Sequence, residues 1–214
     1  ALRELLKKQA AEMAREARHE LRELDTRDSK FLDIKHMVES SCQPAHGKAL
    51  LVSAVKEVVN TELEAKWLEA RAQLVDPLSS SQVKFHGTSA AAADKIVKGG
   101  FKLPGKWRRD LMFGRGIYFA TDSSKSAQEV YTKGTQTLLV CDVFLGKQRM
   151  CNCYDYEADE KSTDPSDPYD SVYAMRNTHE TNGVKFDEFV EDQIEIISGV
   201  RTVLMASDLN RFPG

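Results

Sequence analysis

Cysteine is scarce in this sequence, and no stretch of it is apolar for long enough to cross a membrane. The four cysteines, at positions 42, 141, 151 and 153, are too few in 214 residues for a disulfide scaffold. Cys151 and Cys153 form a C-x-C pair, but no second pair of Cys or His follows at the spacing of a zinc site, so we expect no metal. A secretory leader pattern is also missing. We therefore expect a cytoplasmic or nuclear protein with no membrane partner.

The sequence also lacks a strong charge of either sign. With 30 Lys and Arg against 33 Asp and Glu, its formal net charge is -3, which argues against bulk electrostatic binding to nucleic acid. Apolar residues make up 41% of the chain, as in ordinary globular proteins. A chain of this length can bury a sizeable hydrophobic core without disulfides or bound metal to stabilise it. The first residue is Ala rather than Met, and we expect the sequence to be a segment of a longer protein.

The first 48 residues are expected to form a helical extension. Leu, Met and Ala recur at helical spacings over residues 2–25, which neither Gly nor Pro interrupts. This pattern predicts one long amphipathic helix that packs on the body of the protein, and a short coiled coil or a partner-binding helix is the alternative. A second, short helix is predicted over residues 31–38, followed by a loop over 40–47.

The rest of the chain mixes strands and helices. Val-rich residues 50–59 favour a strand, with helix as a competitor, and Thr61 is placed to cap the helix that follows. Ser89 is placed to cap a helix that Gly99 and Gly100 end. A further helix is predicted over 122–132, and strands over 83–85, 114–120, 137–146, 185–190 and 201–206. This order of elements is typical of an α+β protein.

Three sequence fragments stand out together: FHGTS (85–89), FGRGIYFATDSSKSA (113–127), and YDSV (169–172) with GVKFDEFV (183–190). Alone, each is also typical of a turn or a helix start. In this order and at these separations they resemble the signature of the poly(ADP-ribose) polymerase-like (diphtheria-toxin-like, H-Y-E type) ADP-ribosyltransferases. The resemblance covers about residues 50 to 200 and is densest between 85 and 131.

The resemblance implies an α+β fold with a split antiparallel/mixed β-sheet that binds NAD+, over residues 49–214, behind the helical extension of residues 1–48. It also implies a glycosyltransferase of the pentosyltransferase class that uses NAD+ as substrate, without a metal, and releases nicotinamide. Cleavage of the bond between nicotinamide and ribose passes through a transition state like an oxocarbenium ion, as in glycoside hydrolysis.

By resemblance, the nicotinamide half of NAD+ meets four residues. The Gly87 main chain and the Ser126 hydroxyl hold the carboxamide, and the missing side chain of Gly87 lets its backbone come close. Tyr118 and Tyr131 sandwich the ring. In the chain-elongating members the second tyrosine lies three residues after the serine, where this chain has Glu129. Tyr131 lies five residues after Ser126, which resembles the mono-transferring branch.

The adenosine half is expected to meet His86, which hydrogen-bonds a ribose hydroxyl, with Thr88 beside it. Lys125 precedes Ser126 and is a candidate contact for the acceptor or a substrate phosphate, or else a solvated helix residue. Arg108 belongs to a basic loop where the family has its donor-site loop. It is a candidate contact for the NAD+ pyrophosphate or for an acidic or nucleic-acid acceptor, or else a solvated residue. Residues 154–170 hold seven Asp or Glu against one Lys and predict an exposed acidic loop.

The third catalytic residue, after His86 and Tyr118, depends on the register of one strand. A family Glu on this strand binds the 2′-hydroxyl of the nicotinamide ribose and stabilises the developing charge. Glu188 takes that place if DEFV corresponds to the family's N-E-Y-I/V. If Gln193 is instead aligned with the corresponding Gln of the family, Lys185 takes the place of the Glu. The choice matters because shifting a strand by one residue reverses which side chains face the site.

Three functions follow from these alternatives. The first is mono-ADP-ribosylation of protein acceptors, with automodification expected. The second is a chain-elongating poly(ADP-ribose) polymerase, which Glu188 in the site would allow. The third is a catalytically weak module that binds NAD+ or a partner, which Lys185 in the site would favour. A nucleic-acid acceptor is a further alternative, which nothing in the sequence selects.

Overall fold

A large mixed sheet organises the computed structural model, which describes residues 1–46, 48–105, 111–158, 164–174, 188–191, 204–207 and 210–213. Within these residues nine strands follow the order β1-β3-β10-β6-β4-β5-β9-β8-β7, antiparallel except for the parallel pair β7–β8. The strands are β1 (His19–Glu23), β3 (Ala54–Asn60), β4 (Ser81–Gly87), β5 (Ile117–Ala120), β6 (Leu138–Phe144), β7 (Gln148–Cys151), β8 (Ser171–Ala174), β9 (Glu188–Glu191) and β10 (Leu204–Ser207). Strands β2 (Lys48–Leu51) and β11 (Asn210–Pro213) pair separately. The predicted α+β class with a mixed sheet is confirmed.

Two helices cover opposite faces of the sheet around β6. Helix α2 (Ser29–Ser40) buries Phe31, Ile34 and Val38 in one cluster with Leu138 and Val140. Helix α4 (Ala90–Gly99) packs in a second cluster that contains the alternate residues of β6, Leu139, Cys141 and Val143. Because successive side chains of a strand point to opposite faces, β6 is apolar on both. The Ser89 hydroxyl caps α4 by accepting a hydrogen bond from Ala92 N at 3.3 Å, as predicted.

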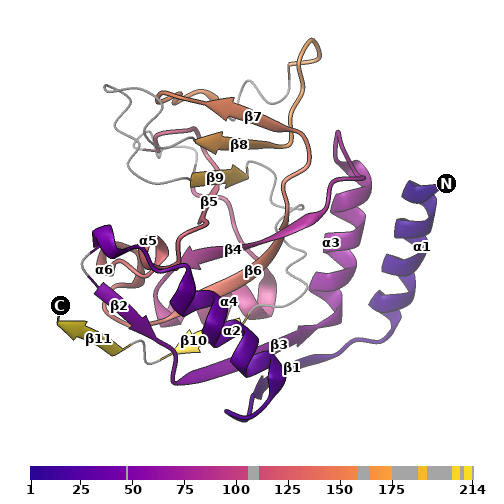
Figure 1. Cartoon of the computed structure of the whole chain (residues 1–214). Coiled ribbons are helices and arrows are strands. Elements are labelled where there is room, and N and C mark those ends of the chain that lie inside the picture. The colour runs from indigo at the N-terminus through magenta and orange to yellow at the C-terminus, as the bar shows by residue number, and fades with distance from the viewer. Residues whose placement is uncertain are drawn as a thin grey trace.

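The single helix predicted over residues 2–25 is wrong. Helix α1 covers only Leu2–Arg15, and β1 then pairs antiparallel with β3. The side chain of Thr61 causes the change of direction, because its hydroxyl donates to Glu16 O at 2.7 Å and accepts from Arg18 N at 2.9 Å. A contact 45 residues away in sequence therefore ends the helix. Helix α1 packs against α3 (Thr61–Gln73), and Figure 1 shows the two side by side at one side of the molecule.

Two local predictions on the way to α3 need correction. The strand predicted over residues 50–59 is divided into β2 and β3, which belong to different sheets. The cap of α3 is Asn60, whose side chain accepts from Leu63 N at 3.2 Å, while Thr61 is the first helical residue. The hydroxyl predicted to cap α3 is used by the chain that follows α1 instead.

The sheet opens between β4 and β5, and this opening creates the site. Among the described residues the two strands share only the pair Phe85–Ala120, so β4 is not paired with β5 at His86 and Gly87. The helix predicted over 122–132 is divided into α5 (Ser123–Ser126) and α6 (Glu129–Thr132), which lie against this opening. In the part of the chain that the structure describes, no helix is both long and apolar enough to span a membrane.

Candidate active site

A cavity of about 640 Å³ lies where the sheet opens. It is lined by residues from β4, β5, α5 and α6 and from the loops before β5. Seven of the residues singled out in the sequence line it: His86, Gly87, Thr88, Tyr118, Lys125, Ser126 and Tyr131. Residues up to 45 positions apart in the sequence thus meet at one cavity.

Gly87 sits at the tightest point of the wall. A Cβ atom at this position would lie 1.7 Å from Ser126 O and 2.7 Å from Ser126 C, both backbone atoms, and 3.1 Å from Tyr131 Cβ. Only glycine therefore allows the backbone of β4 to touch the last residue of α5. The contact places the Gly87 main chain, the Ser126 residue and the base of Tyr131 together on one wall.

The protonation of His86 follows from its hydrogen bond. Its Nδ1 lies 2.9 Å from the carbonyl oxygen of Tyr118, which can only accept, so Nδ1 carries the proton and Nε2 of the neutral ring is an acceptor. Burial lowers the pKa of His86, and the hydrogen bond to the Tyr118 carbonyl opposes this in part. Phe101 meets the ring edge-to-face at 5.0 Å, and Phe119 packs against it at 5.7 Å. The ring is thus held neutral and in one orientation.

Tyr118 and Tyr131 are held by different means. The Tyr118 hydroxyl donates to Gly114 O at 2.8 Å and accepts from Phe113 N at 3.1 Å, which ties the ring to the glycine turn before β5. Tyr131 is 39% exposed, and its hydroxyl accepts from Lys125 Nζ at 3.0 Å. One ring is therefore fixed by the fold, while the other is open to solvent and held by a cation.

The Ser126 hydroxyl is buried and donates to Phe85 O at 2.9 Å. Its two lone pairs remain acceptors in this arrangement. Helix α5, which carries Ser126, is held in place by Gln43 and His46, two residues of the segment that follows α2. Gln43 N donates to Ser124 Oγ at 2.9 Å, and His46 Nδ1 lies 2.6 Å from the same oxygen. Burial also lowers the pKa of His46.

The last strand of the predicted site is partly described. Glu188 is the first residue of β9, which pairs with β5 so that Glu188 is opposite Ala120 and Val190 is opposite Tyr118. The backbone of Glu188 therefore lies next to the strand that carries Tyr118, and its assignment as the third catalytic residue stays a prediction. Lys185 and Arg108 lie outside the described residues.

Some lining residues were not singled out by the sequence. Lys133 follows α6 with a left-handed backbone (φ 52°), and its side chain lines the cavity together with Val130. Leu111 and Met112 form the wall before the glycine turn. No motif marked them, although the two apolar residues between a basic loop and a glycine turn are a weak signal. Together with Lys102 and Lys125, Lys133 makes the described lining cationic, because no Asp or Glu is among these residues.

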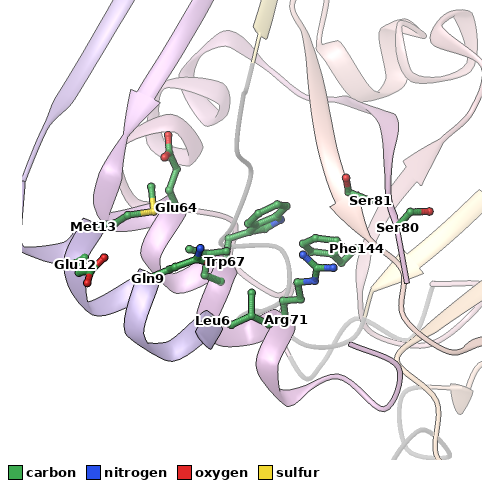
Figure 2. Close-up of a pocket in the computed structure, with 11 residues that line it drawn as sticks. Leu6, Gln9, Glu12, Met13, Glu64, Trp67, Arg71, Ser80, Ser81 and Phe144 are labelled. Atoms are coloured by element: carbon green, nitrogen blue, oxygen red, sulfur yellow. The ribbon is translucent and has the colours of Figure 1, made fainter. Parts of the chain in front are cut away.

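A second hollow of about 680 Å³ shares no lining residue with this cavity. It lies between α1, α3 and the start of β4, and Figure 2 shows Trp67, Arg71 and Phe144 close together among the residues that line it. None of the motif residues lines this second hollow, so we place the candidate site in the cavity of about 640 Å³ beside β5. In the described part of the chain no group of three or more His, Cys, Asp or Glu is arranged to hold a metal ion.

Comparison with known proteins gives one family. The family model described as "Poly(ADP-ribose) polymerase catalytic domain" matches residues 28–201. Poly [ADP-ribose] polymerase 2 of Caenorhabditis elegans is 30% identical over 126 residues, which are 56% of this chain and 23% of that protein. Protein mono-ADP-ribosyltransferase PARP10 of Mus musculus is 27% identical over 133 residues, which are 59% of this chain and 14% of that protein. Protein mono-ADP-ribosyltransferase PARP4 of Homo sapiens is 33% identical over 130 residues, covering 55% of this chain and 7% of that protein.

Proposed function

This chain belongs to the poly(ADP-ribose) polymerase catalytic-domain family, and from that premise we propose that it is an NAD+-dependent ADP-ribosyltransferase. The chain spans less than a quarter of the length of the three relatives described above. The observation that carries the proposal is the meeting of His86, Gly87, Tyr118, Ser126 and Tyr131 at one cavity. No residue of this set is adjacent to another in the sequence except His86 and Gly87.

The nicotinamide half of NAD+ fits the wall that Gly87 and Ser126 form. A carboxamide offers one acceptor and two donors, which match the main-chain groups of Gly87 and the lone pairs of the Ser126 hydroxyl. Tyr118 and Tyr131 offer aromatic faces, each worth about 0.5–1.5 kcal/mol in an offset stack. Nicotinamide is thereby oriented for departure.

The rest of NAD+ fits the remaining lining. The acceptor Nε2 of neutral His86 suits a ribose hydroxyl, which can donate to it. Lys102 and Lys133, with Lys125, suit the diphosphate, because no carboxylate among the described lining residues opposes them. A dinucleotide is also of the right size for a cavity of about 640 Å³.

The reaction needs no redox partner. The bond between nicotinamide N1 and ribose C1′ breaks, and its electron pair leaves with neutral nicotinamide. An acceptor nucleophile forms a bond to C1′, and its proton passes to a base. The positive charge that develops on the ribose is stabilised by a nearby carboxylate. We assign this role to Glu188, whose backbone lies in the strand beside Tyr118.

We further propose that the product is a single ADP-ribose unit on a protein acceptor. Tyr131 supports this, because its place five residues after Ser126 resembles the mono-transferring branch and not the elongating one. Two of the three relatives described above are themselves named mono-ADP-ribosyltransferases. Transfer to the chain itself is expected as well.

The test is incubation of the purified chain with NAD+, in which nicotinamide release and protein labelling are read together. Wild type is compared with Glu188→Gln and with Glu191→Gln, a matched control at the other end of β9. We expect discrete labelling and nicotinamide release, both lost in Glu188→Gln and kept in Glu191→Gln. A smear of larger products would indicate elongation. Binding of NAD+ without nicotinamide release in wild type would indicate a binding module.

A further inference from the structure

Strand β1 forms one edge of the nine-stranded sheet. In the part of the chain that the structure describes, it pairs with β3 on one side and has no strand on the other. Figure 1 shows β1 beside β3 at the lower margin of the molecule. Four of its five residues are exposed, and Leu21 at its centre is 37% exposed. An edge strand of this kind can pair with a strand from another chain.

The outer side of β1 presents evenly spaced main-chain groups. Leu24 N donates to Val55 O at 2.9 Å, so Leu24 bonds toward β3. Because the bonding direction alternates along an antiparallel pair, the N–H and C=O groups of His19, Leu21 and Glu23 point away from β3. Among the described residues no loop hydrogen bond uses these groups. They are therefore open to a partner strand.

A second copy of β1 fits this outer side in one register. Antiparallel pairing centred on Leu21 places Leu21 opposite its own copy, and His19 opposite Glu23 of the second copy. All three residues carry outward main-chain groups, so each of these pairs can exchange two hydrogen bonds. A shift of one residue sets outward groups against residues that bond to β3, and these bonds are lost.

The side-chain charges favour the same register. Glu20 then lies opposite Arg22 of the second copy, and His19 lies opposite a carboxylate. The neighbouring registers that keep main-chain bonds are shifted by two residues. One of them places Glu20 opposite Glu20, and the other places Arg22 opposite Arg22. Like charges directly opposite each other destabilise a strand pair, so both neighbouring registers are disfavoured.

The charges of β1 are also held ready within each chain. Arg22 forms an ion pair with Glu57 of β3, and Glu20 forms one with Arg18 at 2.5 Å. A guanidinium group has five N–H donors, so Arg22 can hold Glu57 and still donate to Glu20 of the second copy. Pairing of two copies therefore joins these ion pairs into one network without breaking either.

We propose that two copies of this chain associate through β1, in a two-fold symmetric antiparallel strand pair centred on Leu21. The contact uses a strand of five residues from each copy, so the dimer is weak and forms as the protein concentration rises. Charges on an edge strand oppose pairing with most foreign strands, whereas these charges match their own copy. Strands β3, β10 and β6 separate β1 from β4 and β5, so the cavity lies apart from the contact. The proposal does not depend on the transferase function.

The test is analytical ultracentrifugation of the purified chain over a range of concentrations, without NAD+. Wild type should pass from monomer to dimer as its concentration rises. Leu21→Lys sets two ammonium groups against each other at the centre of the strand pair, and it should raise the dimer Kd about tenfold or more. Leu32→Lys is the matched control, because Leu32 lies on α2 and is 51% exposed. It should keep the wild-type Kd.

A charge exchange tests the register itself. In a pair of identical chains, His19→Glu sets carboxylates opposite each other, and Glu23→Lys sets lysine opposite histidine. Each variant alone should raise the Kd about three- to tenfold. An equal mixture of the two variants restores attraction at both positions and should dimerise at least as tightly as wild type. Glu23→Lys also faces Lys56 of β3, so unfolding in urea checks that each variant keeps its fold.

A wild-type chain that stays monomeric up to about 1 mM would overturn the proposal. So would a dimer that Leu21→Lys leaves intact, since that dimer must use another surface, such as the opposite edge strand β7. If the mixture of charge variants associates no more tightly than each variant alone, the register centred on Leu21 is wrong. Because no NAD+ is present, a chain without transferase activity gives the same outcomes.

Discussion

At position 87 a hydrogen atom is the only side chain that fits. We predict that Gly87→Ala lowers the free energy of unfolding by about 2–3 kcal/mol, because the new methyl group meets the rigid backbone of Ser126 rather than a flexible side-chain end. It should also abolish NAD+ binding, since relief requires α5 to move away from β4. Denaturant unfolding and calorimetric titration with NAD+ measure the two effects.

Gly99→Ala is the matched control, because nothing lies within 4 Å of a Cβ built there. It should keep NAD+ binding and change stability by less than about 1 kcal/mol. Wild-type NAD+ affinity in Gly87→Ala would contradict the assignment of this wall to the nicotinamide carboxamide.

His86 should make NAD+ binding sensitive to acid only. Its pKa is lowered by burial, so the ring stays neutral as the pH falls through the ordinary histidine value of about 6.5. Protonation of Nε2 at still lower pH removes the acceptor for a ribose hydroxyl. We predict that NAD+ affinity stays constant as the pH falls from neutral through about 6.5 and declines only at a pH below that value, as measured by titration across pH.

The protonation of His86 also affects stability in the same direction: the free energy of unfolding, like NAD+ affinity, falls at low pH. A group whose pKa is lower in the folded chain favours unfolding by acid, so this cost of His86 is absent above about pH 6.5 and grows as the pH falls below it. His86→Gln, which does not titrate, should bind NAD+ more weakly and show no such decline. A binding midpoint above 6.5 in wild type would show that Nε2 of neutral His86 is not the acceptor.

At the scale of elements, local pattern predicted strand and helix types better than their ends. Leu21 and Leu24 continue the helical spacing of α1, and no Gly or Pro interrupts it. Yet His19–Glu23 pairs with β3, because Thr61 captures the backbone at Glu16 and Arg18. Such a contact between distant residues leaves no trace in a local periodicity, and pairing overrides helix propensity here.

The candidate site was predictable where motifs carried it and not elsewhere. The motifs marked Gly87, Ser126 and Tyr131, which the structure brings to one wall, but not the close approach of the Gly87 backbone to Ser126. Lys133 was missed because its position at the cavity depends on its own left-handed backbone at the end of α6, which no motif marks. The resemblance implied a split sheet, but nothing in the sequence marked β4 and β5 as the strands between which it opens, since both look continuous.

Asp170 joins three chain segments and should be a major contributor to stability. Its buried carboxylate accepts from Lys147 N at 2.7 Å, Val75 N at 2.8 Å and Asp76 N at 3.2 Å. Asp170→Asn replaces one acceptor oxygen by a donor that faces these N–H groups. We predict a loss of about 2–4 kcal/mol in the free energy of unfolding, measured with urea.

Asp167→Asn is the comparison for this change, because Asp167 makes an exposed ion pair with Lys147 at 2.8 Å. Exposed pairs contribute about 0–1 kcal/mol, so this variant should unfold near wild type. Equal stabilities of the two variants would mean that the three N–H groups find water or other acceptors when the Asp170 carboxylate is lost.

At the scale of the whole molecule, one sheet carries two separate hollows. The cavity beside β5 and the hollow beneath α1 share no lining residue, and the second is bounded by Trp67 and Phe144, whose rings lie 4.4 Å apart. Arg71 places its guanidinium 4.2 Å from the centre of the Phe144 ring. A disturbance beneath α1 should therefore be sensed by Trp67 while the cavity that carries Tyr118 keeps its shape.

Leu6 offers a way to separate the two. It is 3% exposed on the face of α1 that meets α3, and it lines the hollow beside Trp67, whereas its neighbour Leu5 is 51% exposed. Leu6→Ala should lower the free energy of unfolding by about 2–3 kcal/mol and shift the tryptophan fluorescence, since it removes buried methyl groups next to the indole. Leu5→Ala should change neither by a measurable amount. NAD+ affinity should stay at the wild-type value in both, because the hollow that Leu6 lines and the cavity beside β5 share no lining residue in the described part of the chain. A parallel fall of NAD+ affinity in Leu6→Ala would instead mean that the packing of α1 on α3 is transmitted through β4 to Gly87, and that the N-terminal helix is part of the donor site's support.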